Sequence, residues 1–193
     1  MPSLALFSAI IMGFYLTTFL ALTIRSARES GQAIWLFGRD RRQGLPAWLF
    51  RLAFAGGFFY PLLIACGVTP VMEFAAPPAA LRAAGLLLAL AGAFLAAYAQ
   101  HHMGASWRIG SVKGHSGDIV DTGPFRLSRN PVFVGQVALF AGFLLARPDI
   151  VQLALAAAVT LAVSLQVRIE EKVLERDLGA PYRAYASRVR RWL

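Results

Sequence analysis

The sequence contains few cysteines, histidines and acidic residues. Cys66 is the only cysteine among 193 residues, which excludes a disulfide within the chain and a cysteine-based metal site. The three histidines have no further ligands at zinc spacing, so no metal site is predicted. The chain also lacks the glycine-rich phosphate motifs G-x-G-x-x-G and G-x-x-x-x-G-K-[ST], and the G-x-S-x-G motif of acyl-transfer enzymes. These absences exclude the corresponding nucleotide-binding and acyl-transfer classes.

Long apolar runs dominate what is present. The chain is 58% hydrophobic with a mean hydropathy of +0.58, more than a soluble domain needs. Of five apolar stretches, the first three have the roughly 20 residues that cross a bilayer. The last two are shorter and are separated only by Arg147-Pro148-Asp149, which predicts a helical hairpin. The stretches cover residues 4–24, 47–68, 79–99, 131–146 and 150–167.

This pattern predicts an all-α integral membrane protein with five transmembrane helices in a single domain, residues 1–193. Residues 1–24 lack a basic start and a small-residue cleavage site. The first stretch is therefore expected to remain as a span and not to be removed as a signal.

The net charge of +9 and the pI near 10.8 could indicate a nucleic-acid partner. The basic residues lie beside the apolar stretches, however, where arginine contacts lipid phosphates, so the expected partner is the lipid bilayer and not a nucleic acid. In the five-span arrangement, all 19 basic residues except Arg82 and Arg147 fall on one side. The positive-inside rule makes that side cytoplasmic, with the N-terminus outside and the C-terminus in the cytoplasm. In a bacterium the membrane would be the inner one.

Three polar segments, 25–45, 100–130 and 168–193, lie on the predicted cytoplasmic side. The middle segment is unusually long for a structureless loop, and loops of such length are usually either functional or disordered. The tail has apolar residues at helical spacing, and Gly179-Ala180-Pro181 is expected to break it into two short helices.

Two short clusters could carry chemistry. In the first, Arg168, Glu170 and Glu171 follow the fifth apolar stretch at the predicted start of a helix. Arg168 and Glu171 are three residues apart and would share a helix face. Taken alone, the cluster can equally be a snorkelling arginine with solvated glutamates.

The second cluster precedes the fourth apolar stretch. Gly123-Pro124 predicts a turn, Asn130 an N-cap and Pro131 the first residue of a helix. Arg126 and Arg129 can simply hold lipid phosphates. Together, however, the two clusters predict one site at the membrane surface. Arginine suits a carboxylate and glutamate suits a ribose diol, which describes a charged, nucleoside-like ligand.

The two motifs resemble a known family. The stretch KGHSGDIVDTGPFRLSRNPVFVG (113–135), followed by RIEEKVLERDLGAPYRAYASRVRRW (168–192), is similar to the isoprenylcysteine carboxyl methyltransferase family, most closely to its bacterial and archaeal members. The resemblance implies a small membrane methyltransferase that uses S-adenosylmethionine. It implies a cytoplasmic cofactor pocket within residues 100–193 and a lipophilic acceptor that enters from the bilayer. The three spans in residues 1–99 agree with the family only in general character.

The resemblance also implies roles for individual residues. Arg129 and Asn130 would contact the methionine end of the cofactor, and Glu171, with Glu170, its other polar groups. Arg168 and Glu171 are the implied catalytic residues, with Arg168 orienting the acceptor. The implied cofactor-binding residues are Lys113, His115, Val120, Gly123, Pro124, Phe125, Arg129, Asn130, Pro131, Glu170, Glu171 and Tyr182.

The chain departs from the family pattern at four positions in these motifs. Asn130 stands where the family usually has histidine, Phe125 and Phe133 stand where it has tyrosines, and Leu178 stands where it has phenylalanine. These changes leave the cofactor pattern intact and concern the acceptor, for which a carboxylate on a lipophilic or small molecule is expected first. Two alternatives stay open: an NADPH-dependent membrane sterol-type reductase, which usually carries an acid at the position of Gln136, and a non-enzymatic membrane scaffold.

Overall fold

The computed structural model describes residues 2–31, 44–70, 73–109 and 119–193. Within these ranges the regular elements are helices, and Glu73 and Asp149 form an isolated β-bridge. This confirms the predicted all-α class. The helices are α1 (Pro2–Ser30), α2 (Gly44–Ala65), α3 (Ala79–Met103), α4 (Pro131–Ala146), α5 (Ile150–Leu178) and α6 (Ala180–Arg188), with short 3-10 helices η2 (Gly104–Ser106) and η3 (Gly123–Arg126).

Four of these helices, α1, α2, α3 and α5, are long and apolar enough to cross a membrane. Helix α4 is also apolar but has only 16 residues, fewer than the roughly 20 that span a bilayer without distortion. Four of the five predicted spans are therefore helices with the length and composition of a membrane span. A crossing by α4 stays a prediction.

Helix α4 packs against α3 with close approach of the two backbones. A Cβ atom added to Gly85 of α3 would lie 2.5 Å from the backbone nitrogen of Ala146, and one added to Gly92 would lie 2.6 Å from the carbonyl oxygen of Gly135. Neither position has room for a side chain. Small residues at helix contacts are typical of membrane proteins, because close packing replaces the hydrophobic drive that water provides elsewhere.

Helix α5 corrects one prediction about the tail. Arg168, Glu170 and Glu171 do not begin a new helix but lie in the C-terminal part of α5, which runs unbroken for 29 residues. The reason is that residues 150–178 contain neither glycine nor proline. The predicted break at Gly179 is confirmed: Gly179 has φ +59° and separates α5 from the nine-residue α6.

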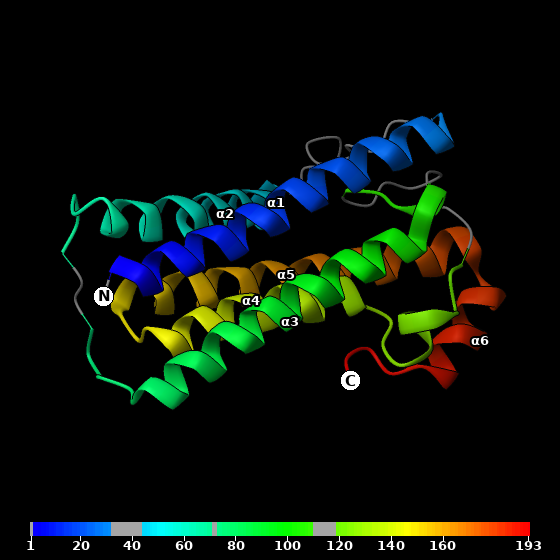
Figure 1. Cartoon of the computed structure of the whole chain (residues 1–193). Coiled ribbons are helices and arrows are strands. Elements are labelled where there is room, and N and C mark those ends of the chain that lie inside the picture. Colours follow the sequence, from blue (N-terminus) through cyan, green and yellow to red (C-terminus); the bar gives the residue numbers. More distant parts are fainter. Residues whose placement is uncertain (1, 32–43, 71–72, 110–118) are drawn as a thin grey trace.

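The helix ends divide the molecule into two regions (Figure 1). The C-terminal ends of α1, α3 and α5, the N-terminal ends of α2 and α4, and the whole of α6 lie together at one end. The N-terminus, the connection from α2 to α3 and the turn from α4 to α5 lie at the other. The three polar segments are thus attached at one common end, as the five-span arrangement requires. Which end faces the cytoplasm stays a prediction.

The turn between α4 and α5 is the tight turn expected from Arg147-Pro148-Asp149. Asp149 caps α5 by accepting a hydrogen bond from the backbone N–H of Gln152 at 2.8 Å. The other Asp149 oxygen lies 3.0 Å from Nε of Arg147, and both side chains are buried. Arg82 forms a second pair with Glu73, with nitrogen–oxygen distances of 3.0 and 2.7 Å. Arg82 and Arg147, the two basic residues set apart by the sequence, are therefore both ion-paired at this end.

Candidate functional site

A cavity of about 330 Å³ lies at the end of the bundle that contains α6. Its wall is built by side chains from α1, α2, α4, α5 and α6 and from the segments that follow α3. One part of the wall is polar and includes Arg129, Asn130, Glu170 and Glu171. Another part is apolar and mostly aromatic. The volume is at the lower end of the range of about 300–1,000 Å³ that is usual for small-ligand sites.

The centre of the polar part is the carboxylate of Glu171, which is shared by two arginines. Arg129 Nη1 lies 3.2 Å from Glu171 Oε1. Arg191 binds the same carboxylate with two nitrogens, Nε at 3.0 Å and Nη2 at 2.7 Å. Arg129 Nη1 also lies 3.4 Å from the hydroxyl oxygen of Tyr182. Two cations thus share one carboxylate, which leaves local positive charge beside the cavity.

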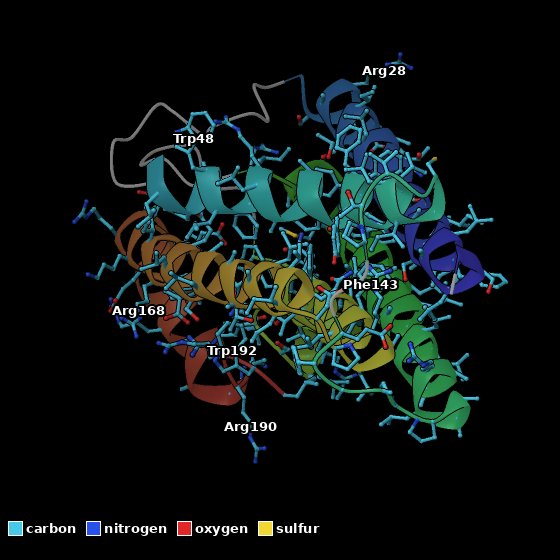
Figure 2. The ribbon with its side chains drawn as sticks, turned by 90° about the vertical axis from the view of Figure 1, so that its left-hand side faces the viewer. Arg28, Trp48, Phe143, Arg168, Arg190 and Trp192 are labelled. Carbon is cyan, nitrogen blue, oxygen red and sulfur yellow. The ribbon has the colours of Figure 1, made fainter. Side chains whose placement is uncertain are left out.

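The C-terminal tail is fixed to the residues that precede α4. The backbone N–H of Arg129 donates to the carbonyl oxygen of Arg190 at 2.9 Å. The amide Nδ2 of Asn130 donates to the carbonyl oxygen of Arg191 at 3.0 Å, and Oγ of Ser128 donates to the same oxygen at 3.3 Å. The Arg190 side chain itself points outward, away from these contacts (Figure 2). The tail therefore holds Arg191 against Glu171.

Asn130 occupies the predicted N-cap position of α4, and its carbonyl accepts a hydrogen bond from Val134 N at 3.0 Å. Its side chain makes no capping hydrogen bond, which corrects the expectation of a side-chain cap. The side chain is instead used to hold the tail. Pro131 begins α4 as predicted, at a position where its missing N–H has no cost.

Glu170 has different surroundings from its neighbour Glu171. Its Oε1 accepts a hydrogen bond from Nε2 of Gln166, one helical turn earlier on α5, at 2.9 Å. Across the cavity wall, Nε2 of Gln136 donates to the hydroxyl oxygen of Tyr15 at 2.7 Å. Gln136, Gln166 and Tyr15 are at most 4% exposed. Polar side chains thus continue from the ion-paired cluster into the apolar part of the cavity.

The apolar part is a series of aromatic rings from three helices and from the segment that follows η2. Phe50 of α2 stacks on Phe133 of α4 with a centroid distance of 5.9 Å and an interplanar angle of 15°. Phe54 stacks on Tyr15 of α1 at 5.6 Å and 25°. Phe19 meets Trp107 edge-on at 5.8 Å. All of them line the cavity, which therefore offers a flat apolar surface next to its charged part.

The two tyrosines of α6 support the polar part. Burial raises the pKa of the Tyr185 phenol to about 12, and burial with the nearby Glu171 carboxylate raises the pKa of Tyr182. Both phenols therefore stay protonated at neutral pH. The Tyr185 hydroxyl donates to the carbonyl oxygen of Phe125 at 2.9 Å and so ties α6 to η3. The hydrogen bond to Glu171 raises the pKa of Arg191, which keeps the pair charged.

The structure brings most of the predicted site residues together. The predicted residues that line the cavity are Val120, Phe125, Arg129, Asn130, Pro131, Glu170, Glu171 and Tyr182. Gly123 and Pro124 form η3 behind the wall, where Gly123 has φ +54° and an added Cβ would lie 2.7 Å from the His102 ring. Lys113 and His115 lie outside the described residues.

Arg168 is the exception among the described candidates. Its side chain is exposed and points away from the helix bundle (Figure 2), and it is not part of the cavity wall. Residues two positions apart on a helix diverge by about 160°. Because Gln166 and Glu170 face the cavity from α5, Arg168 between them faces away. The geometry does not support its predicted catalytic role.

Several residues in or next to the cavity wall were not predicted from the sequence. Gln166 and Gln136 lie in apolar stretches, where a polar residue is itself a signal of function. Arg191 fits the family motif, but nothing local in the sequence pairs it with Glu171, twenty residues earlier. Within the described ranges, no group of three or more His, Cys, Asp and Glu side chains could hold a metal ion.

A family profile described as phospholipid methyltransferase matches residues 81–180, which is more than half of the chain. The chain belongs to the phospholipid methyltransferase family. No curated protein and no solved structure matches it. With its apolar helices, this member of the family is an integral membrane methyltransferase. The match includes Arg129, Asn130, Glu170 and Glu171 and ends before Tyr182 and Arg191.

Proposed function

We propose that the protein transfers a methyl group from S-adenosylmethionine to a lipophilic or small acceptor at the cytoplasmic surface of the membrane. The observation that carries this proposal is the single cavity with two kinds of wall, one ion-paired and one aromatic. A charged cofactor and an apolar acceptor need these two surfaces side by side. The two motifs that resemble isoprenylcysteine carboxyl methyltransferases contribute the polar wall, which supports that more specific relationship.

The donors and acceptors in the wall fit the cofactor. S-adenosylmethionine presents a carboxylate, positive nitrogen and sulfur centres, a ribose diol and a flat base. Arg129 lines the cavity, and its guanidinium carries more N–H donors than its contacts with Glu171 and Tyr182 use, so it can bind an anionic group. The carboxylates of Glu170 and Glu171 suit hydroxyl or ammonium groups, and the aromatic rings suit the base. We infer that Arg129, Asn130, Glu170, Glu171 and Tyr182 hold the cofactor, together with Lys113 and His115.

The chemistry that the cofactor supplies when bound is an activated methyl group on a positively charged sulfur. The protein therefore needs to align the partners and exclude water. The wall from Phe50 to Phe133 excludes water on the membrane side. The tail closes the opposite side through Asn130 and Arg191. Glu171 keeps its proposed role at the reacting site, whereas the exposed Arg168 is given none.

The proposal also includes the orientation of the protein in the membrane and the chemical class of the methyl acceptor. The charge bias favours a cytoplasmic position for the cavity end, with the N-terminus outside. The family resemblance favours a carboxylate as the methyl acceptor. Membership in a methyltransferase family argues against the reductase and scaffold alternatives. Gln136, at a position where such reductases usually carry an acid, argues in the same direction.

Calorimetry with the purified protein in detergent tests the proposal. S-adenosylmethionine is expected to bind and NADPH is not. Glu171→Gln removes the charge that holds Arg129 and Arg191 in place, so we expect about 10- to 100-fold weaker binding of S-adenosylmethionine. Glu29→Gln is the matched control, since Glu29 is exposed on α1, pairs with Arg25 at the surface and is not part of the cavity wall. A wild-type protein that does not bind S-adenosylmethionine at near-millimolar concentration would refute the proposal.

A further inference from the structure

We propose that His102 is a positioning residue for the cofactor-binding part of the cavity. His102 lies at the C-terminal end of α3 and does not line the cavity itself. It acts by holding η3, the short helix that carries Phe125 into the cavity wall. This inference rests on the proposed binding of S-adenosylmethionine, and it adds a residue that lies outside both sequence motifs.

The His102 ring contacts two side chains at η3. Its Nε2 lies 2.8 Å from Oγ1 of Thr122, the residue directly before η3. Either tautomer of the ring can form this hydrogen bond, because a hydroxyl group can both donate and accept. The ring also stacks on the ring of Phe125, with a centroid distance of 6.4 Å and an interplanar angle of 23°. One side chain of α3 thus holds η3 through a polar contact and an aromatic contact.

The backbone of η3 lies directly against the same ring. Gly123, the first residue of η3, has φ +54°, a conformation that favours glycine. A Cβ atom added to Gly123 would lie 2.7 Å from Cε1 and 2.8 Å from Nε2 of His102. The imidazole therefore occupies the space that a side chain at position 123 would need. Glycine permits both the turn and the close contact, so η3 and His102 fit each other.

The other side of η3 is held by α6. The Tyr185 hydroxyl donates to the carbonyl oxygen of Phe125 at 2.9 Å. The Tyr185 ring packs against the ring of Tyr182 with a centroid distance of 6.4 Å, and the Tyr182 hydroxyl lies 3.4 Å from Nη1 of Arg129. Helix η3 thus lies between His102 and Tyr185, and a series of contacts leads from it to the cavity arginine.

The place of η3 matters for a ligand in the cavity. Val120 and Phe125 line the cavity, and Arg129 follows three residues after η3 ends. A four-residue 3-10 helix has few internal hydrogen bonds, so its position depends on its neighbours. Without the His102 contacts, binding of the cofactor would have to order this part of the wall, and that ordering lowers affinity. His102 therefore influences binding without touching the cofactor.

Calorimetry with S-adenosylmethionine and the full chain in detergent tests the inference. We expect His102→Ala to bind about 3- to 10-fold more weakly than the wild type, the effect of one lost hydrogen bond. His102→Gln keeps a polar nitrogen close to the position of Nε2 and should restore the affinity to within about twofold of the wild type. His101→Ala is the matched control: His101 is the neighbour of His102 on α3, is exposed and is not part of the cavity wall, so its affinity should be unchanged.

Thr122→Val removes the same hydrogen bond from the other side. Thr122 is exposed, so this variant is expected to fold even if His102→Ala does not. It should show a comparable loss of affinity, and the double variant should bind within about twofold of His102→Ala, because both changes remove one contact. Hydrogen–deuterium exchange in residues 122–127 should be faster in His102→Ala and slow again at saturating S-adenosylmethionine.

The outcomes separate this inference from the proposed function. If His102→Ala speeds exchange in residues 122–127 but binds S-adenosylmethionine as tightly as the wild type, His102 has a structural role only and the inference is wrong. The inference is also wrong if Thr122→Val leaves the affinity unchanged, or if His101→Ala weakens binding as much as His102→Ala. The proposed function stands in each of these cases. If the wild type does not bind S-adenosylmethionine, the proposed function fails, and the inference that rests on it fails as well.

Discussion

Both ends of the helix bundle bury charged side chains, but they combine them differently. At the α4–α5 turn each arginine has its own acid: Arg82 pairs with Glu73 and Arg147 with Asp149. At the cavity end, Arg129 and Arg191 share Glu171. One-to-one pairs hold the chain in place. Two arginines that share one carboxylate carry a net positive charge, and this charge can attract an anionic group of a ligand.

The surroundings of the two ends differ in a second way. At the turn, Asp149 also caps α5, so its pair is part of the helix framework. At the cavity end, Arg129 and Glu171 form their pair in the wall of a cavity. Charge at the turn is therefore expected to serve stability, and charge at the cavity is expected to serve binding. Three substitutions test this division.

Asp149→Ala should have the largest effect, and it should be on stability. It removes the α5 cap and leaves Arg147 buried without its acid, which costs about 3–5 kcal/mol of the free energy of unfolding. Thermal and denaturant unfolding in detergent measure the loss. Asp121→Ala is the control, because its pair with Arg188 is exposed. If Asp149→Ala left stability unchanged and weakened S-adenosylmethionine binding in the folded fraction, the charged pair at the turn would serve binding and not stability.

Arg129→Ala should have an intermediate effect, and it should be on binding. Glu171 keeps Arg191 as a partner, so folding is preserved, but the surplus cation is lost. A charge-assisted hydrogen bond is worth about 1.5–3 kcal/mol, which predicts about 10- to 150-fold weaker binding of S-adenosylmethionine. Arg188→Ala should leave the affinity unchanged, since Arg188 is exposed. If Arg129→Ala and Arg188→Ala bound S-adenosylmethionine equally well, the positive charge of Arg129 would have no part in binding.

Asn130→Ala should have the smallest effect. It removes the hydrogen bond to the Arg191 carbonyl and loosens the tail, which should lower cofactor affinity by about 0.5–1.5 kcal/mol. Hydrogen–deuterium exchange should show faster exchange in residues 189–192. Asn130→His tests the family difference, because histidine can also donate to that carbonyl. Unchanged exchange in Asn130→Ala would mean that Ser128 and the Arg129 backbone hold the tail without it.

Local patterns were sufficient for the helices and for the grouping of the two motifs. Four apolar stretches became helices of spanning length, and Gly179 and the Pro148 turn ended helices where expected. The number of spans determines which loops lie on the same side of the membrane. This placed both motifs at one end of the bundle, with Gly123-Pro124 and Arg129 in the first and Glu171 in the second. The charge next to residue 167 suggested a new helix start, yet α5 continues, because charged residues do not end a helix that lacks glycine and proline.

The parts of the site that the sequence did not predict depend on contacts between residues far apart in the chain. Arg191 reaches Glu171 only because the tail turns back after α6, and Tyr15 meets Gln136 across 121 residues of sequence. Asn130 was expected to cap α4, but a carbonyl of the tail competes successfully for its amide. No spacing rule predicts such pairs, because they are set by how the helices pack.

The unbroken α5 fixes the distance between the α4–α5 turn and the cavity. Asp149 anchors its first turn, and Glu171 follows 22 positions later, which at 1.5 Å per residue is about 33 Å along the axis. This length is close to the thickness of the hydrocarbon core, about 30 Å. If the capped end of α5 lies at one membrane–water interface, this length would place Glu171 near the opposite interface. A bilayer of different thickness would move the carboxylate relative to the lipid head groups without changing any contact inside the protein.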